Sequence, residues 1–238
     1  MPAAYGENYA EFFDFVYGSR APEEMVDALA QLAGDGPVLE LGVGTGRVAI
    51  PLTDRGLEVT GTDNSAEMLS ALAAKPGGAA VKTTRTELPR IDVDSQYGLI
   101  ACLDNTLLLL PTQDQQAECF SNAAQLLTDD GVLVLETLVG GPGDAGVVPA
   151  HFGENATVLW AYQLDPLSQQ FHIREIIFGN DLVRVVPFDG RGVSAAELDL
   201  MARLAGLQLR ERWSDWNRTP AAPDSRLVIS VYERSGGR

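Results

Sequence analysis

"VLELGVGTGRVAI", residues 38–50, is the stretch that decides the fold of this chain. Residues 38–41 are apolar except for one acid, which predicts a short buried strand. Gly42, Gly44 and Gly46 follow at every second position, and an amphipathic segment comes after them. Glycine lets a backbone approach a ligand closely, and a helix N-terminus presents free N–H groups. A strand, a glycine loop and a helix in this order therefore predict a nucleotide-type binding site.

The residues up to about 138 continue this alternation of strands and helices. Ser65 has the chemistry of a helix N-cap, and Gly131 marks the turn before the last strand of the series. Such spacing indicates βαβ units and a parallel sheet. The predicted strands cover 57–63, 79–84, 97–104 and 131–137, and the predicted helices cover 47–55, 65–75 and 112–127.

The pattern changes at about residue 140. A breaker-rich linker, "GGPGDAG" at 140–146, is followed by three strand-like segments with turn residues between them. They predict an antiparallel meander inserted into the α/β frame, over 157–165, 169–179 and 181–189. The frame then resumes with a helix that Ser194 caps and Gly206 stops, and two strands finish the chain.

Length and charge narrow the classes of function. At 238 residues the chain suits one α/β domain with a small subdomain, and its net charge of −16 argues against a nucleic-acid partner, which requires a basic face. Cys102 and Cys119 predict two free thiols, and the two histidines offer no zinc spacing, so we expect no metal. The chain shows neither a signal-peptide pattern nor an apolar run long enough to span a membrane. We expect a cytoplasmic protein.

Two acids near the glycine loop separate two classes of cofactor. Counted from Gly44, "GTGRVA" fits the G-x-G-x-x-A loop of dinucleotide sites, as in a nicotinamide oxidoreductase. Counted from Glu40, the loop has an acid inside the strand end, and a buried carboxylate costs several kcal/mol unless it is paired. Asp63 ends the next strand, 17 residues after Gly46, where it can accept hydrogen bonds from ribose hydroxyls. This pattern favours a cofactor without a pyrophosphate and with a cationic amino-acid end.

Several motifs together resemble the class I S-adenosylmethionine-dependent methyltransferases, closest to the bacterial small-molecule type with a β-meander. They are "VLELGVGTGRVAIPL", "VTGTDNSAEML", "YGLIACLDNTLLLL", "DDGVLVLET" and the tail from "ELDLMARLAG" to "RLVISVYER", and they cover roughly residues 9–138 and 194–234. The resemblance implies a Rossmann-like seven-stranded sheet with helices on both faces and the last strand antiparallel. It also implies an N-terminal helical lid (1–34), a cofactor-binding core (35–140 and 190–238) and an inserted antiparallel subdomain over the active site (141–189).

The resemblance implies a role for individual residues of the cofactor site. Glu40 and the glycine loop match the motif that holds the methionine part of the cofactor, Asp63 matches the ribose-binding acid, and Met68 flanks the adenine. Thr84 aligns where the family usually has an acid that accepts from the adenine amine, so this sequence departs from the pattern there. The remaining cofactor-binding candidates are Asn64, Arg85, Leu103 and, in the lid, Tyr17 and Arg20.

The substrate side is less marked in the sequence. Methyl transfer is an in-line displacement that depends mainly on alignment, and a base is needed only when the nucleophile carries a proton of high pKa. Asp104, Glu136 and the loop 214–225 are expected at one rim of the sheet. His172, the only histidine of the meander, alternates with its apolar neighbours and is a candidate base if it faces the pocket. The catalytic candidates are His172 and Asp104, and the substrate-binding candidates are Glu136, Trp160 and Trp216.

These observations predict methyl transfer from S-adenosylmethionine, with S-adenosylhomocysteine as product, to an oxygen or nitrogen of a small molecule in secondary metabolism. Two alternatives stay open: a cofactor-binding enzyme of non-methylating type, such as a cyclase or regulatory scaffold, and a nicotinamide-dependent oxidoreductase. The sequence leaves open a homodimer and names no substrate.

Overall fold

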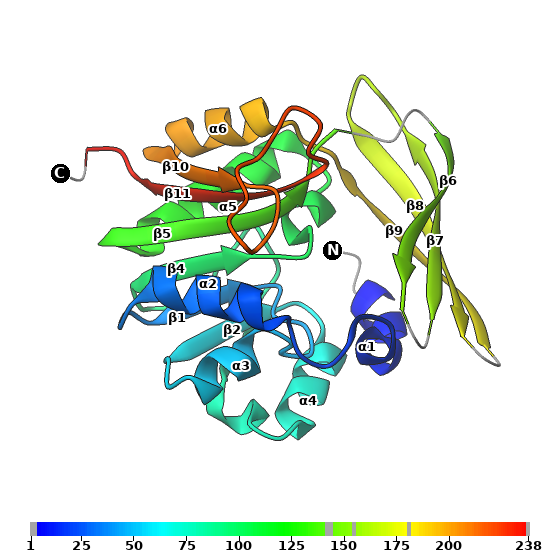
Figure 1. Cartoon of the computed structure of the whole chain (residues 1–238), viewed down its shortest axis with the longest axis horizontal. Coiled ribbons are helices and arrows are strands. Elements are labelled where there is room, and N and C mark those ends of the chain that lie inside the picture. Colours follow the sequence, from blue (N-terminus) through cyan, green and yellow to red (C-terminus); the bar gives the residue numbers. More distant parts are fainter. Residues whose placement is uncertain (1–3, 141–144, 154–155, 180–181, 237–238) are drawn as a thin grey trace.

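The computed structural model describes residues 4–140, 145–153, 156–179 and 182–236, and within them two separate β-sheets (Figure 1). The larger has seven strands in the order β10-β11-β5-β4-β1-β2-β3. All its pairings are parallel except those of β11, which runs antiparallel to both β5 and β10. The predicted fold class is therefore confirmed. The strands are β1 (Val38–Leu41), β2 (Val59–Asp63), β3 (Lys82–Arg85), β4 (Tyr97–Cys102), β5 (Leu127–Leu138), β10 (Leu207–Trp213) and β11 (Leu227–Arg234).

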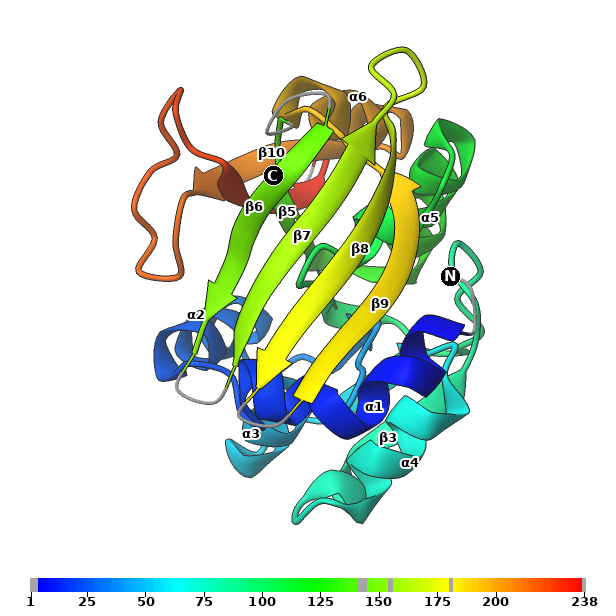
Figure 2. The same ribbon diagram turned by 90° about the vertical axis from the view of Figure 1, so that its right-hand side faces the viewer.

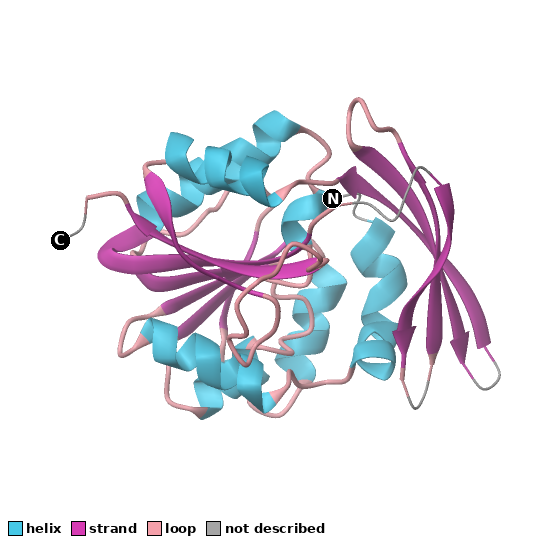
Figure 3. Ribbon diagram, turned by 45° about the horizontal axis from the view of Figure 1, so that its top comes forward, coloured by secondary structure: helices cyan, strands magenta, loops and turns pink. Residues whose placement is uncertain are grey.

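Helices cover both faces of this sheet (Figure 3). One apolar cluster joins the sheet to α2 (Glu23–Ala33), α3 (Ala49–Asp54) and α4 (Ala66–Ala74), and a second joins it to α5 (Gln113–Leu126) and α6 (Ala195–Leu204). The predicted caps form: Ser65 Oγ accepts from Met68 N and Ser194 Oγ from Glu197 N. Short 3₁₀ turns lie at Gly78–Ala80 (η1) and Thr106–Leu109 (η2). Both cysteines are buried and free, as predicted.

The second sheet is antiparallel and has four strands, one more than the sequence predicted. They are β6 (Ala145–Phe152), β7 (Thr157–Leu164), β8 (Gln170–Gly179) and β9 (Leu182–Arg191). The missed strand is β6, which begins inside the predicted linker and contains Pro149. Proline lacks the N–H that a central strand needs, but β6 is an edge strand and its register shifts between Pro149 and His151. Pro149 is therefore compatible with a strand at the edge of the sheet.

The first helix, α1 (Ala4–Tyr17), lies between the two sheets (Figures 1 and 2). Tyr9 and Val16 pack in one cluster with Val158, Ile177 and Val186 of the second sheet. By contrast, α2, which is also part of the predicted lid segment, packs into the core of the larger sheet. We call the second sheet, β6 to β9, the roof. In the part of the chain that the structure describes, no helix is both long and apolar enough to cross a membrane.

Candidate active site

A cavity opens at the carboxyl ends of β1, β2 and β4, where strand order reverses between β1 and β4. It holds about 630 Å³ of space, part of it open to solvent. A smaller cavity of about 330 Å³ adjoins it and shares five of its lining residues. This edge of an open α/β sheet is where such folds bind ligands. The shared residues are Gly42, Asp63, Asn64, Thr106 and Leu109.

The glycine loop forms one wall of the cavity. Gly42 has a φ of +75°, and a Cβ there would lie 2.6 Å from the Thr106 side chain, so only glycine fits between β1 and η2. Gly44 has a φ of +53°, and a Cβ there would meet nothing within 4 Å. Gly44 therefore presents bare backbone to the cavity. Gly46 packs against Leu72 instead.

Asp63 connects the loop to the next helix. Its Oδ2 accepts from Gly44 N at 3.0 Å and its Oδ1 accepts from Ser65 N at 2.9 Å. Burial raises the pKa of this carboxyl above its ordinary value, and the backbone donors of Ser65, Gly44 and Asn64 oppose the rise. Because a carboxylate offers about four lone-pair positions, each oxygen can accept a further bond from the cavity side.

Glu40 and Arg47 place two polar atoms in the same cavity without partners. Burial, and next the charge of Asp104, raise the pKa of Glu40 to about 8. Glu40 Oε2 and Arg47 Nε are both buried and have no hydrogen-bond partner among the described residues. The Arg47 guanidinium does bind Asp104, at 2.8 Å and 3.1 Å from its two carboxylate oxygens. A free acceptor and a free donor on residues of one cavity fit a zwitterion, an ammonium for Glu40 and a carboxylate for Arg47.

Arg47 was absent from the predicted site residues. Its position supplied the signal that could have found it, because it directly follows the last glycine of the loop, close to the start of α3. In the dinucleotide loop this position is one of the variable residues, so a charged side chain there carried no weight.

Comparison with known proteins assigns the family. Residues 38–131 match the family described as "Methyltransferase domain". The whole chain is 35% identical to the CcbJ methyltransferase of Streptomyces caelestis, with 98% of each chain covered and a TM-score of 0.87. The chain is a class I S-adenosylmethionine-dependent methyltransferase. This assignment decides against a nicotinamide oxidoreductase.

Two further relatives name their acceptors. The methyltransferase is 25% identical over 243 residues to a cypemycin N-terminal methyltransferase of a Streptomyces species, with 98% of each protein covered. The amino pentose methyltransferase CalS10 of Micromonospora echinaspora is 18% identical, with a TM-score of 0.69, 94% of this chain and 96% of that chain covered, which shows the shared fold alone.

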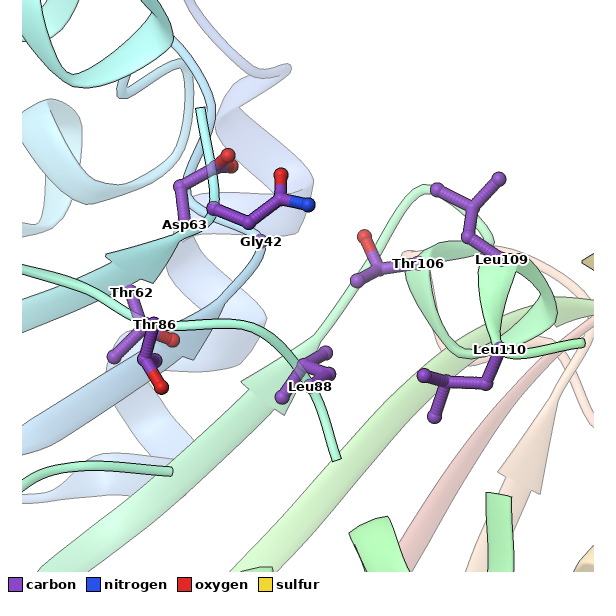
Figure 4. Close-up of a pocket in the computed structure, with 9 residues that line it drawn as sticks. Gly42, Thr62, Asp63, Thr86, Leu88, Thr106, Leu109 and Leu110 are labelled. Atoms are coloured by element: carbon purple, nitrogen blue, oxygen red, sulfur yellow. The ribbon is translucent and has the colours of Figure 1, made fainter. Parts of the chain in front are cut away.

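The structure places Thr84, the candidate predicted for the adenine side, away from both cavities. Thr84 lies inside β3, opposite Thr62, and does not line either cavity. Arg85 is exposed and donates its Nε hydrogen to the Asn64 carbonyl at 2.9 Å. The strand runs one residue further than predicted, so the first residue beyond it is Thr86, which is 5% exposed and lines the cavity. Figure 4 shows this space, with Leu88 and Leu110 on opposite sides of it.

Asp104 and Glu136 meet at the rim, as predicted, but with different roles. Glu136 Oε2 accepts from Asp104 N at 3.0 Å and its Oε1 accepts from Trp216 Nε1 at 2.9 Å. Both oxygens of Glu136 are thus used inside the protein, and Trp216 is in the core. Neither lines the cavity, so the structure does not bring these two substrate-binding candidates to it. Asp104 does line it, whereas Leu103 is buried and its carbonyl accepts from Thr106 N.

The two lid candidates, Tyr17 and Arg20, differ in how close they lie to the cavity. Tyr17 donates its hydroxyl to Glu175 Oε1 at 2.6 Å, and its ring lies 5.1 Å from that of Phe13, which lines the cavity. Met68, 4% exposed, also lines the cavity. Arg20 is wrong as a cavity residue: it is half-exposed and forms an ion pair with Asp54 at 2.6 Å. A neighbouring acid at the end of α3 therefore holds it away from the cofactor site.

His172 does not face the active site of the methyltransferase. Its side chain is 62% exposed, and its Nδ1 lies 2.8 Å from Asp189 Oδ1. The buried residues of β8 are Ile173, Glu175 and Ile177, so His172 points from the outer face of the roof. The catalytic prediction for His172 is wrong on this geometry. Trp160, on β7, donates Nε1–H to Glu175 Oε1 at 3.3 Å and so belongs to the inner face.

Proposed function

We propose that this methyltransferase transfers a methyl group to an amine nitrogen of a small molecule. The observation that carries the choice of nitrogen is the lining of the two cavities: among the described residues it contains neither histidine, lysine nor cysteine. Its acids have other partners, because Asp63 accepts from backbone N–H groups, Asp104 binds Arg47, and Glu40 is assigned below to the cofactor. An alcohol needs a base to make it nucleophilic, whereas an amine that has lost its proton to solvent attacks without one. The N-terminal acceptor named for the cypemycin enzyme, a relative over its whole length, supports the same choice.

The proposed cofactor site uses both cavities. Glu40 holds the ammonium of S-adenosylmethionine, and Arg47 holds its carboxylate. Asp63 accepts from the ribose hydroxyls beside the bare backbone of Gly44, and Thr86 bonds the adenine edge in the smaller cavity. The pairing of each free polar atom with a complementary group supports this arrangement. Met68 and Asn64 contribute packing along the same wall.

The protein's part in the reaction is alignment and exclusion of water. When bound, the cofactor supplies an electrophilic methyl on a sulfonium. The acceptor nitrogen forms the new N–C bond with its lone pair, the electrons of the broken S–C bond stay on sulfur, and the product ammonium releases its extra proton to water. We propose that α1 and the roof cover the acceptor during this step, because α1 lies between the roof and the cavity.

The test is product analysis with methyl-labelled S-adenosylmethionine. The protein is incubated with matched amines and alcohols, and products are identified by mass spectrometry. We expect one added methyl on nitrogen and stoichiometric S-adenosylhomocysteine. Methyl transfer to oxygen alone would overturn the proposal. Intact cofactor together with a chemically changed substrate would instead assign the non-methylating type of function.

A further inference from the structure

Glu175 is a buried acid outside the proposed cofactor site. It lies in the middle of β8 on the inner face of the roof, with Trp160 and Val186 as its cross-strand neighbours. Its side chain is 1% exposed. Oε1 accepts from both the Tyr17 hydroxyl and the Trp160 indole. Oε2 is buried and has no hydrogen-bond partner in the described parts of the chain.

Glu175 thus has hydrogen-bond donors at Oε1 but none at Oε2 among the described residues. A buried carboxylate is costly unless its lone pairs are satisfied and its charge is paired. The described residues provide Glu175 with two neutral donors and with no ion pair to lysine, arginine or histidine. A cationic N–H donor that arrives with the substrate would satisfy both the free oxygen and the charge.

Glu175 and Tyr17 do not themselves line either cavity, but Tyr17 links Glu175 to the cavity wall. The Tyr17 ring lies 5.1 Å from that of Phe13, a cavity residue, in a tilted arrangement. Burial, Glu175 and Asp104 all raise the pKa of the Tyr17 hydroxyl. Tyr17 therefore lies within electrostatic range of an acid in the cavity wall and in contact with the acid in the roof. The ring of His151 also lies 5.3 Å from that of Tyr17, and its Nε2 is buried without a partner among the described residues.

Aromatic rings surround the same part of the roof. Trp160 meets Phe188 edge-on at 6.2 Å between ring centroids, and Phe188 meets Phe171 in the same way at 6.2 Å. Phe171 packs against the core of the larger sheet. An ammonium group beside aromatic rings and a carboxylate gains from both, because ring faces carry partial negative charge.

We propose that Glu175 is the residue that selects the acceptor: its free oxygen binds an N–H of a cationic amine, which then releases one proton to solvent so that the nitrogen lone pair can attack. The roof thereby distinguishes amines from alcohols of the same shape. The inference rests on the proposed N-methylation and deepens it. Tyr17 and Trp160 are the positioning residues that hold the carboxylate, and the neighbouring rings receive the organic part of the acceptor.

The test compares Glu175→Gln with the unmodified protein. Glutamine keeps an oxygen that accepts from Tyr17 and Trp160, so the packing is retained while the charge is lost. The probes are phenethylamine and phenethyl alcohol, titrated by tryptophan fluorescence against protein saturated with S-adenosylhomocysteine. We expect the unmodified protein to bind the amine at least about tenfold more tightly than the alcohol, and Glu175→Gln to lose this preference. Affinity for S-adenosylhomocysteine, measured by calorimetry, should stay unchanged.

His172→Gln is the matched control, because it lies on the same strand but on the exposed face, and it should keep the preference. Glu175→Asp keeps the charge and should retain part of the preference, which covers the case in which Glu175→Gln does not fold. An unmodified protein without preference for the amine, or an equal preference in Glu175→Gln, overturns the inference. Loss of the amine preference in Tyr17→Phe together with its retention in Glu175→Gln would also overturn the inference, because the Tyr17 hydroxyl and not the Glu175 charge would then determine the preference. Methylation of oxygen with the amine preference intact would defeat the proposed N-methylation alone.

Discussion

The replacement Glu40→Gln tests the cofactor site through its protons. The pKa of Glu40 is raised from 4.5 to about 8, chiefly by burial. The folded state therefore holds a proton that the unfolded chain has already released, and the stability from this proton is fully present below pH 4.5 and lost as pH rises through 8. At 1.36 kcal/mol per unit, the full shift corresponds to roughly 5 kcal/mol, of which roughly 3 kcal/mol is lost between pH 6 and pH 9.

Two measurements follow from this pKa. Denaturant unfolding of the ligand-free protein should give an unfolding free energy that falls more steeply from pH 6 to pH 9 than that of Glu40→Gln, by roughly 3 kcal/mol. Calorimetric titration with S-adenosylhomocysteine at about pH 6.5, in buffers of different ionisation heat, should show release of about one proton per ligand, because the ammonium requires an ionised Glu40. Glu40→Gln should release about none.

Parallel pH profiles for the two proteins, or binding without proton release in the unmodified protein, would refute the raised pKa of Glu40. Either result would mean that Glu40 is already ionised before the ligand binds and that its buried oxygen has another partner. Retained tight binding by Glu40→Gln would separately show that the ammonium lies elsewhere.

Three further replacements address the rest of the site and its support. Arg47→Gln should weaken S-adenosylhomocysteine binding by about tenfold to a hundredfold, because the carboxylate loses a charge-assisted bond; calorimetry measures this, and an unchanged Kd contradicts the assignment. Thr86→Val should weaken the same binding by about fivefold, while Thr84→Val, outside both cavities, should leave it unchanged. Equal effects of the two replacements would support Thr84, the residue predicted from the sequence, on the adenine side. Gln116 is fully buried, donates to the Arg191 carbonyl at 3.0 Å and accepts from the Arg191 guanidinium at 2.7 Å. Gln116→Leu should therefore lower the unfolding free energy, measured by denaturant titration, by about 1–3 kcal/mol. An unchanged unfolding free energy would show that Arg191 finds another partner.

Local chemistry was enough to predict the glycine loop and most strands of the larger sheet. The prediction was wrong at the start of β5, which begins at Leu127, so that Gly131 lies inside the strand and not in a turn before it. The strand at 38–41, the end of the next strand at Asp63 and the cap at Ser65 all lie where the sequence places them. These features depend on hydrophobic runs, on glycine and on a capping side chain, each of which acts within a few residues of its neighbours. Membership of the methyltransferase family followed from the same motifs in series.

The adenine side and the edge strand depended on longer-range contacts. Thr84 and Thr86 differ by two residues, and only the pairing of β3 with β2 determined that the strand extends to Arg85. The strand β6 was missed because a proline is tolerated only where no neighbouring strand needs its N–H, and the sequence does not say which strand is at the edge.

The sequence by itself determined that His172 and Glu175 lie on opposite faces of one strand, because side chains alternate along it. Which face is buried was decided only by the tertiary structure, when α1 packed against the roof and enclosed Glu175 and left His172 in solvent. The same holds for Glu40 and Arg47. The sequence gives their separation along the chain, but their unpartnered atoms belong to one cavity only after β1, α3 and β4 have come together.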